Sequence, residues 1–487
     1  MATAPRAAYA VHMTLAQPTT LEIVGASLFG IAVLHTFCTA YFERLAHGQT
    51  AHAGLWRLLG EVETVFGFWA IVLIAFMAFA AGWSPTSVYL DDRRFVEPMF
   101  VFVIMVIAAS RPVMQLATDA VRIAGAALPV PAGTARFFLA LTLVPMLGSF
   151  ITEPAAMTLA ALMLRETIFS RGASNALKYA TLGVLFVNVS IGGTLTNFAA
   201  PPVLMVAAKW DWSSATMFSL LGWKAAIAVV INAAALTLLF RRELAARATA
   251  QGGAHAPRVP AAFVGVNALL LAAVVFAAHD PEVFMGLFLM FLGLAEAYRR
   301  YHSRLMLREG LMVAFFLAGL VVLGGQQAWW LQAALSGMSE SALFYGATAL
   351  TAITDNAALT YLGSMVEGVS DEFKYALVAG AVAGGGLTVI ANAPNPAGFA
   401  ILKDSFDDQA INPFRLFAAA LPPTLVAVLC FRGLGANLGE ILDLARWTDW
   451  LAQLDPAFAF LLLMPVLVAV VGLWAERRER EDDRDAP

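Results

Sequence analysis

Charged residues are scarce in this sequence. Only 13% of its 487 residues are Asp, Glu, Lys or Arg, against about 25% in soluble domains. In contrast, 60% of the residues are apolar and the mean hydropathy is +0.74. So few charges cannot cover an apolar interior of this size in water. The composition excludes a soluble enzyme, a nucleic-acid-binding protein and a disordered regulator, and it predicts an all-α polytopic membrane protein.

Cysteine is nearly absent as well. The two thiols, Cys38 and Cys430, both lie in apolar segments. Two cysteines placed in this way form neither a disulfide framework nor the spacing of a metal site. We expect two lone buried thiols, and we expect no cofactor.

Apolar segments of roughly twenty residues, the length that crosses a bilayer, recur along the whole chain. A polar, basic linker at 241–260 separates a first half, 21–240, from a second half, 261–432. An N-terminal segment, 1–20, precedes these halves, and a C-terminal helix and tail, 433–487, follow them. The apolar segments predict about 11 full spans, near residues 21–42, 61–83, 95–117, 176–209, 215–240, 261–278, 281–298, 310–333, 373–403, 413–432 and 457–475.

Lys and Arg predict the orientation in the membrane. Nineteen of the 30 basic residues lie in five loops and the C-terminal tail, and the positive-inside rule places these in the cytoplasm. The N-terminus is then outside and the C-terminus inside a bacterial-type cytoplasmic membrane. The segment 136–165 must enter and leave on the cytoplasmic side, since a straight helix of its length would measure about 45 Å against a hydrocarbon core of about 30 Å. It therefore predicts a re-entrant hairpin with Thr152-Glu153-Pro154 at its tip.

A second apolar segment, 341–366, is flanked by acidic residues. It predicts a second hairpin that enters from outside, with Thr354-Asp355-Asn356 at its tip. The two tips are similar in sequence, because residues 151–158 and 353–360 are identical at five of eight positions. Each half thus holds five spans and one hairpin, and an odd number of spans turns the second copy upside down. The chain predicts the inverted repeat of a secondary transporter, with the substrate bound where interrupted helices meet.

Glycine and proline interrupt one apolar segment of each repeat. Gly192-Gly193 precedes Pro201-Pro202 in the first, and Gly384-Gly385-Gly386 precedes Pro394 in the second. Such breaks free backbone carbonyls and amides, which are costly in hydrocarbon unless they line a polar cavity. We expect both breaks and both tips to share one cavity near the membrane midplane.

Glu153 and Asp355 are the most informative residues. A carboxylate inside a span costs about 2.5–3.5 kcal/mol on insertion scales, and a bound cation offsets its charge. Together with hydroxyls, amides and freed carbonyls, these acids form a site of oxygen atoms that suits Na⁺ or Li⁺ and that can hold a proton instead. Sodium is expected at Glu153 and Asp355. The candidate ion- and proton-binding residues are Thr152, Glu153, Thr354, Asp355, Asn356, Gly192, Gly193, Thr194, Thr196, Asn197, Gly385, Gly386, Asn392 and Asn395.

Three other polar residues leave alternatives open. Arg111 either neutralises a carboxylate or extends to the membrane surface. Lys224 is expected to extend to the surface, although it too could pair with one of the acids. His35 is expected to be packed rather than to titrate during transport.

The paired Thr-acid tips and the two Gly-Gly…Pro segments resemble the ion transporter superfamily, which includes divalent-anion/sodium symporters and sodium/proton antiporters. The likeness extends from about residue 95 to residue 432. In the symporters the tips resemble Ser-Asn-Thr, whereas an acid replaces the amide here in both copies. Thr354-Asp355-Asn356 resembles the Asp-Asn tip of the antiporters, and Thr152-Glu153-Pro154 departs from the symporter pattern in the same direction. The resemblance implies sodium/proton exchange, an elevator-type motion of a transport domain and a homodimer.

The leading hypothesis is therefore a sodium/proton antiporter that works by alternating access. The alternative is a sodium-coupled anion or dicarboxylate carrier, or an anion or metalloid exporter of the same fold. An intramembrane enzyme is not expected, because the sequence has neither an HExxH nor a GxGD motif. A channel is a third option, and the inverted repeat argues against it by analogy only.

Overall fold

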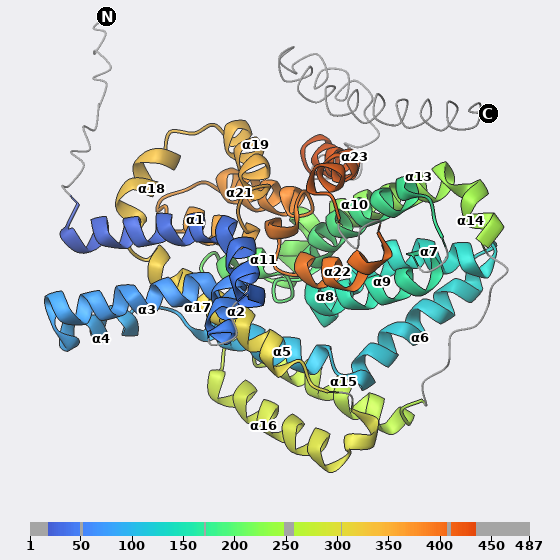
Figure 1. The fold of residues 1–487 in the computed structure, drawn as a ribbon, viewed down its shortest axis with the longest axis horizontal. Helices are drawn as coiled ribbons and strands as arrows, with labels where there is room; N and C mark the ends of the chain where they lie inside the picture. Colours follow the sequence, from blue (N-terminus) through green and yellow to red (C-terminus); the bar gives the residue numbers. More distant parts are fainter. Residues whose placement is uncertain are drawn as a thin grey trace, which may run out of the picture.

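The computed structural model describes residues 18–48, 52–169, 172–247, 258–302, 304–406 and 411–434. These residues form helices and connecting turns, with no strand among them (Figure 1). Several expected features lie outside the described residues: nearly all of the N-terminal segment, the middle of the linker at 248–257, and the C-terminal region with the expected span 457–475.

The helices are named here in chain order. The first half contains α1 (Thr20–Gly48), α2 (Ala53–Gly60), α3 (Val62–Ala81), α4 (Trp83–Asp91), α5 (Val96–Ala108), α6 (Arg111–Ala127), α7 (Ala132–Leu141), α8 (Leu143–Ile151), α9 (Glu153–Thr167), α10 (Asn175–Gly192), α11 (Pro201–Ala207), α12 (Ser214–Met217), α13 (Trp223–Leu239) and α14 (Arg241–Arg247). The second half contains α15 (Ala261–Phe276), α16 (Pro281–Ala297), α17 (Leu307–Gly324), α18 (Ala328–Leu335), α19 (Glu340–Thr351), α20 (Asn356–Ser364), α21 (Asp371–Gly384), α22 (Asn395–Leu402) and α23 (Pro413–Gly433).

Six of the described helical segments are long and apolar enough to cross a membrane, and two bent helix pairs raise this number to eight. The six are Thr20–Thr39, Glu63–Ala81, Asn175–Leu195, Ser214–Leu239, Leu307–Gly324 and Pro413–Gly433. Of the other predicted spans, 261–278 and 281–298 each hold one shorter helix, of 16 and 17 residues, and 373–403 is divided between α21 and α22. The number of about 11 full spans therefore stays a prediction.

The expected span 95–117 is bent. α5 ends at Ala108, and α6 leaves at an angle of 66°. The bend has a local cause, since Ser110 has an extended backbone and Pro112 lies in the first turn of α6, where proline favours a new helix start. Charged and amide side chains follow on one face of α6, so this helix differs from the apolar α5.

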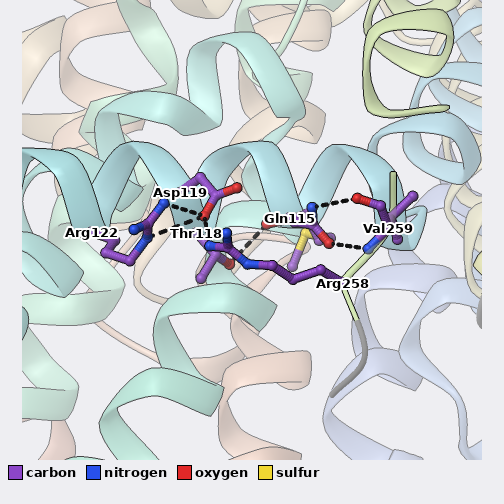
Figure 2. Close-up of polar contacts among 7 residues, drawn as sticks. Gln115, Thr118, Asp119, Arg122, Arg258 and Val259 are labelled. Atoms are coloured by element: carbon purple, nitrogen blue, oxygen red, sulfur yellow. Dashed lines mark hydrogen bonds and ion pairs between the residues drawn. The ribbon is translucent and has the colours of Figure 1, made fainter. Parts of the chain in front are cut away.

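The polar face of α6 holds the segment that leads into α15 (Figure 2). Gln115 exchanges two hydrogen bonds with the backbone of Val259, at 3.0 and 2.7 Å. Asp119 forms ion pairs with Arg122 at 3.1 Å and Arg258 at 2.8 Å. α6 therefore fastens the start of the second half to the first half.

Both expected hairpins contain two helical arms with a turn at the predicted tip. In the first, α8 ends at Ile151, and α9 begins at Glu153 and packs back against α8 and α7. The missing side chain of Gly148 permits this close return, because a Cβ there would lie 3.3 Å from that of Ala156. In the second, α19 and α20 are joined by residues 352–355.

The two halves of the chain contact each other in a reciprocal manner. α11, which follows the break in the first half, packs against α20 of the second hairpin. α22, which follows the break in the second half, packs against α9 of the first hairpin. Figure 1 shows α22 in front of α9 and α11 in the middle of the molecule. These contacts bring both tips and both broken helices into one central region.

α3 and α17 pack very closely. A Cβ at Gly319 would overlap the backbone of Gly67, and a Cβ at Gly67 would overlap the ring of Phe315. The rings of Phe66 and Phe316 meet edge to face, with centroids 5.2 Å apart. Small residues at such positions let two helix backbones approach each other.

The two cysteines differ from each other. Cys430 is buried, as expected, but Cys38 is exposed, so that part of the expectation was wrong. The cause is the position of α1 at the periphery, where it turns an apolar face outward that includes Leu34, 67% exposed, and Phe37, 52% exposed. Such a face suits contact with lipid rather than with the protein interior.

Candidate ion-binding site

The tip of the first hairpin is tightly constrained. Thr152 has φ +71° and ψ 150°, a region that β-branched residues rarely adopt. Its strained backbone ends α8 and places Glu153 at the first position of α9, followed by Pro154. The partial positive charge of a helix N-terminus favours a carboxylate at this position.

Glu153 is fully buried. One carboxylate oxygen, Oε2, accepts a hydrogen bond of 2.8 Å from the Asn392 side chain, which lies in the broken segment of the other repeat. The other oxygen, Oε1, has no hydrogen-bond partner. It lies against Gly193, where a Cβ would overlap it. Glu153 and the glycine break of its own half are thus in direct contact, and the shared cavity near the membrane midplane stays a prediction.

The tip of the second hairpin holds Asp355 and Asn356. Asp355 is half-buried and caps α20, since its Oδ1 accepts hydrogen bonds from the backbone N–H groups of Ala357 and Ala358 at 2.8 and 3.1 Å. Asn356 is fully buried, and both polar atoms of its side chain lack a partner. Asp355 therefore has a structural role as the cap of α20, and the backbone N–H of Ala393 in the broken segment also acts on its carboxylate.

The two broken helices cross next to these tips. Ser190 of α10 donates a hydrogen bond of 2.8 Å to the backbone oxygen of Val382 in α21. A Cβ at Gly385 would overlap the hydroxyl of Ser190 and would lie 2.7 Å from the Asn356 amide nitrogen. Gly386 similarly lies against the backbone of Val187. Glycine is required here because the two backbones and the tip residues approach so closely.

Buried oxygen atoms without a hydrogen-bond partner gather in this region. Native proteins leave few buried polar atoms unpaired, and each unpaired atom costs about 1–3 kcal/mol. The unpaired oxygen atoms are Thr152 Oγ1, Glu153 Oε1, Asn356 Oδ1, Asn392 Oδ1 and Asn395 Oδ1. They belong to the two tips and to the broken segment of the second half. A set of carboxylate, amide and hydroxyl oxygens is the donor set that hard cations take.

Other predicted site residues form hydrogen bonds with backbone oxygens where the two helices are interrupted. Asn395 donates hydrogen bonds of 2.8 Å to the backbone oxygens of Gly385 and Thr388, which helix interruption leaves free. In the first repeat, Thr196 donates to the Ser149 backbone oxygen at 2.6 Å, and the Ser149 hydroxyl donates to the Gly192 backbone oxygen at 2.8 Å. These bonds satisfy carbonyls that would otherwise be orphaned.

The remaining predicted residues lie around this centre. Thr194 donates to the backbone oxygen of Ile191 at 2.6 Å, within its own turn. Asn197 is engaged elsewhere, since its amide bonds the Trp212 backbone oxygen and its carbonyl accepts from Ser214. Thr354 is half-buried directly before Asp355.

A third acid, Glu63, belongs to the electrostatic surroundings of the site and was not predicted. Its charge acts on Asp355, and Asp355 in turn acts on Glu153. The charges of Glu61 and Arg308, which form an ion pair at the start of α3 and α17, act on Glu63 in turn. The signal for it was an acidic side chain in the first turn of an apolar span. Ser149 and Ser190 also escaped prediction, because single serines in apolar helices are common.

The three residues with open alternatives can now be placed. His35 accepts a hydrogen bond from the Trp69 indole at Nδ1, so its Nε2–H donates to the backbone oxygen of Leu59, both at 3.0 Å. These bonds fasten α1 to α2 and α3, which supports a packed histidine. Lys224 donates to the Tyr375 hydroxyl at 3.0 Å and lies over that ring. Arg111 is the first residue of α6.

Neither acid tip is neutralised by a base in the part of the chain that the structure describes. The groups that act on Glu153 are Asn392 and Asp355, and those that act on Asp355 are backbone N–H groups and Glu63. The described residues also contain no group of three or more His, Cys, Asp or Glu side chains that could hold a metal ion. The two tip acids are thus surrounded by neutral polar groups, and the further charge that acts on Asp355 is that of Glu63 in α3.

Comparison with known proteins adds one match. The family described as "Putative Na+/H+ antiporter" matches residues 20–434, which includes both hairpins and both broken helices. The sequence matches none of the curated proteins with which it was compared.

Proposed function

Since the chain belongs to this family of Na⁺/H⁺ antiporters, we propose that it exchanges sodium or lithium for protons across the membrane by alternating access. The exchanged ions bind between the two hairpin tips, and Glu153 and Asp355 carry the charge that attracts them. The family match and the apolar helices favour a multi-pass transporter over an enzyme.

One observation carries the proposal. Glu153 is a fully buried carboxylate whose Oε1 has no hydrogen-bond partner, and buried oxygens of Thr152, Asn356, Asn392 and Asn395 also lack partners. A buried charge without a compensating partner is strongly unfavourable. Either a proton or a small cation relieves this cost, and both use the same oxygen. Competition of the two for one carboxylate is the minimum requirement for exchange.

The chemistry of exchange follows from these oxygens. With a proton bound, the Glu153 carboxyl is neutral and can donate to a nearby acceptor, such as the unpartnered Oδ1 of Asn392. With sodium bound, the same acceptors replace part of the hydration shell of the ion. Because the two loaded forms exclude each other, a sodium gradient drives protons in the opposite direction. The transport rate should rise with pH as protons leave the site.

The reciprocal contacts support an inverted repeat. α11 packs on the second hairpin and α22 on the first, and Gly193 and Gly385 each face the tip of their own repeat. Two interlocked copies of this kind can expose one central site to either side of the membrane in turn. The elevator-type motion and the homodimer rest on the family resemblance and remain part of the proposal.

The function can be tested with purified protein in proteoliposomes. An imposed pH gradient is followed with a fluorescent dye while NaCl, LiCl, KCl and sodium dicarboxylates are added in turn. Sodium and lithium salts should dissipate the gradient, and potassium should not. Dissipation that requires a dicarboxylate would favour the anion carrier instead. The two acids at the tips argue against that alternative, because they would repel a dicarboxylate.

The expected orientation is open to a separate test. The N-terminus is predicted outside and the C-terminus in the cytoplasm, with both ends of the first hairpin cytoplasmic. Single cysteines at Gly133 and Ser174, labelled from each side of the membrane in a variant without Cys38 and Cys430, decide this point. Labelling of the two positions from opposite faces would contradict the re-entrant hairpin and the inverted repeat together.

A further inference from the structure

A basic pocket lies between the end of α16 and the start of α17, away from the ion site. It has a volume of about 820 Å³. Its polar lining consists of Glu296, Arg299, His302, Arg304 and Arg308, and its apolar lining includes Leu292, Leu305 and Leu307. Both helices are largely apolar, so the pocket lies where the ends of two membrane helices meet a polar loop.

The arginines of this pocket are not all neutralised. Arg299 forms an ion pair with Glu296, and Arg308 forms one with Glu61. Arg304 is exposed and has no ion pair among the described residues. The lining therefore keeps a positive charge that is available to an anion.

His302 adds a second polar group. Both of its ring nitrogens are buried and have no hydrogen-bond partner, while the ring packs edge to face on Phe291 at 5.9 Å. Burial lowers the pKa of His302, so the imidazole is neutral near pH 7 and keeps one N–H to donate. An anion in the pocket would accept this hydrogen bond, which no described protein group accepts.

We propose that this pocket binds the phosphate group of an anionic phospholipid. Arg304 supplies the uncompensated charge, and Arg299 and Arg308 add further guanidinium donors, which suit phosphate geometry. The leucines of the lining extend the site towards the acyl chains. Basic pockets between membrane helices are a known mode of headgroup binding. Free inorganic phosphate shares the headgroup chemistry but would make no use of this apolar wall.

The test measures lipid retention. The purified protein, solubilised in detergent, is mixed with phosphatidylglycerol, with phosphatidylcholine, or with inorganic phosphate, and bound lipid is counted by native mass spectrometry over a titration. Arg304→Gln removes the unpaired charge. Arg241→Gln is the control, because Arg241 is an exposed arginine of α14 that does not line the pocket.

Wild-type protein and Arg241→Gln should retain phosphatidylglycerol in preference to phosphatidylcholine. Arg304→Gln should bind it about fivefold more weakly, since one arginine near a membrane surface contributes about that factor. Equal retention by the two variants would overturn the proposal, as would equal binding of both lipids. Displacement of phosphatidylglycerol by millimolar inorganic phosphate would also overturn it and would indicate a free-phosphate site. None of these outcomes depends on ion exchange, so the proposal stands or falls separately from the transport function.

Discussion

Replacing Glu153 with glutamine tests the ion site directly. The variant Glu153→Gln keeps the shape of the side chain and one carbonyl oxygen, which can still accept the 2.8 Å hydrogen bond from Asn392. It removes the negative charge and the oxygen that takes the proton. The new amide N–H₂ takes the position of Oε1, which accepts no hydrogen bond in the structure. Folding should therefore be preserved or improved, because a buried charge is replaced by a hydrogen-bonding neutral group.

The expected effect on ion binding is large. A cation in contact with a carboxylate, about 4 Å from its charge centre, gains about 4 kcal/mol at an effective dielectric constant of about 20. Losing this interaction weakens sodium binding by about three orders of magnitude, since about 1.4 kcal/mol corresponds to a factor of ten. Because Glu153 is 0% exposed, solvent screening should not reduce the effect much.

The assay is sodium-driven proton movement in proteoliposomes, combined with thermal unfolding in detergent. Glu153→Gln should abolish transport and leave the unfolding temperature equal or higher. The matched control is Glu282→Gln, since Glu282 is an exposed acid in the first turn of α16 and should tolerate the same change. Transport by Glu153→Gln at half the wild-type rate or more would refute the assignment of the exchanged charge to this residue.

Three further substitutions probe the surroundings of the site. Gly193→Ala should weaken the activation of transport by sodium at least tenfold, because the new Cβ would overlap Glu153 Oε1. Gly286→Ala is the control and should behave as wild type, because nothing lies within 4 Å of a Cβ there. Equal kinetics of the two variants would contradict the close contact. Thr152→Gly should be more stable than Thr152→Ala by about 1 kcal/mol in thermal unfolding. Both variants lack the hydroxyl, but only glycine adopts φ +71° without strain. Equal stability of the two variants would show that the tip is not strained. Glu63→Gln should lower the apparent sodium affinity about fivefold without abolishing transport, because a partly hydrated carboxylate at this position attracts sodium by on the order of 1 kcal/mol. An unchanged sodium titration would show that Glu63 does not act on the site.

Much of the central region could be predicted because it depends on rare residues in apolar surroundings. Acids, glycines and prolines stand out in membrane segments, and their repetition identified the tips and the breaks. The structure places Glu153 against Gly193, as this reasoning required. The contact between Glu153 and Asn392 was not derivable in detail, because it joins residues 239 positions apart.

Other features escaped the sequence for physical reasons. The bend after Ala108 follows from local backbone conformation at Ser110, which apolar composition does not reveal. The capping role of Asp355 depends on where α20 begins, and helix boundaries are the least certain part of any sequence interpretation. The electrostatic influence of Glu63 on Asp355 follows from tertiary packing, because α3 packs on α17 and α17 packs on α20, and such packing has no sequence signature.

The glycine contact between α3 and α17 has a mechanical consequence. Gly67 and Gly319 let the two helix backbones touch, so that sliding one helix along the other would require them to separate. Glu63 lies on α3, and Asp355 directly precedes α20, whose Tyr361 hydroxyl donates a hydrogen bond of 3.2 Å to the Val321 backbone oxygen of α17. In the proposed transport cycle, a displacement of the second tip relative to α3 and α17 would break this hydrogen bond and change the separation between Glu63 and Asp355. Spin labels at neighbouring positions on α3 and α20 would measure that displacement.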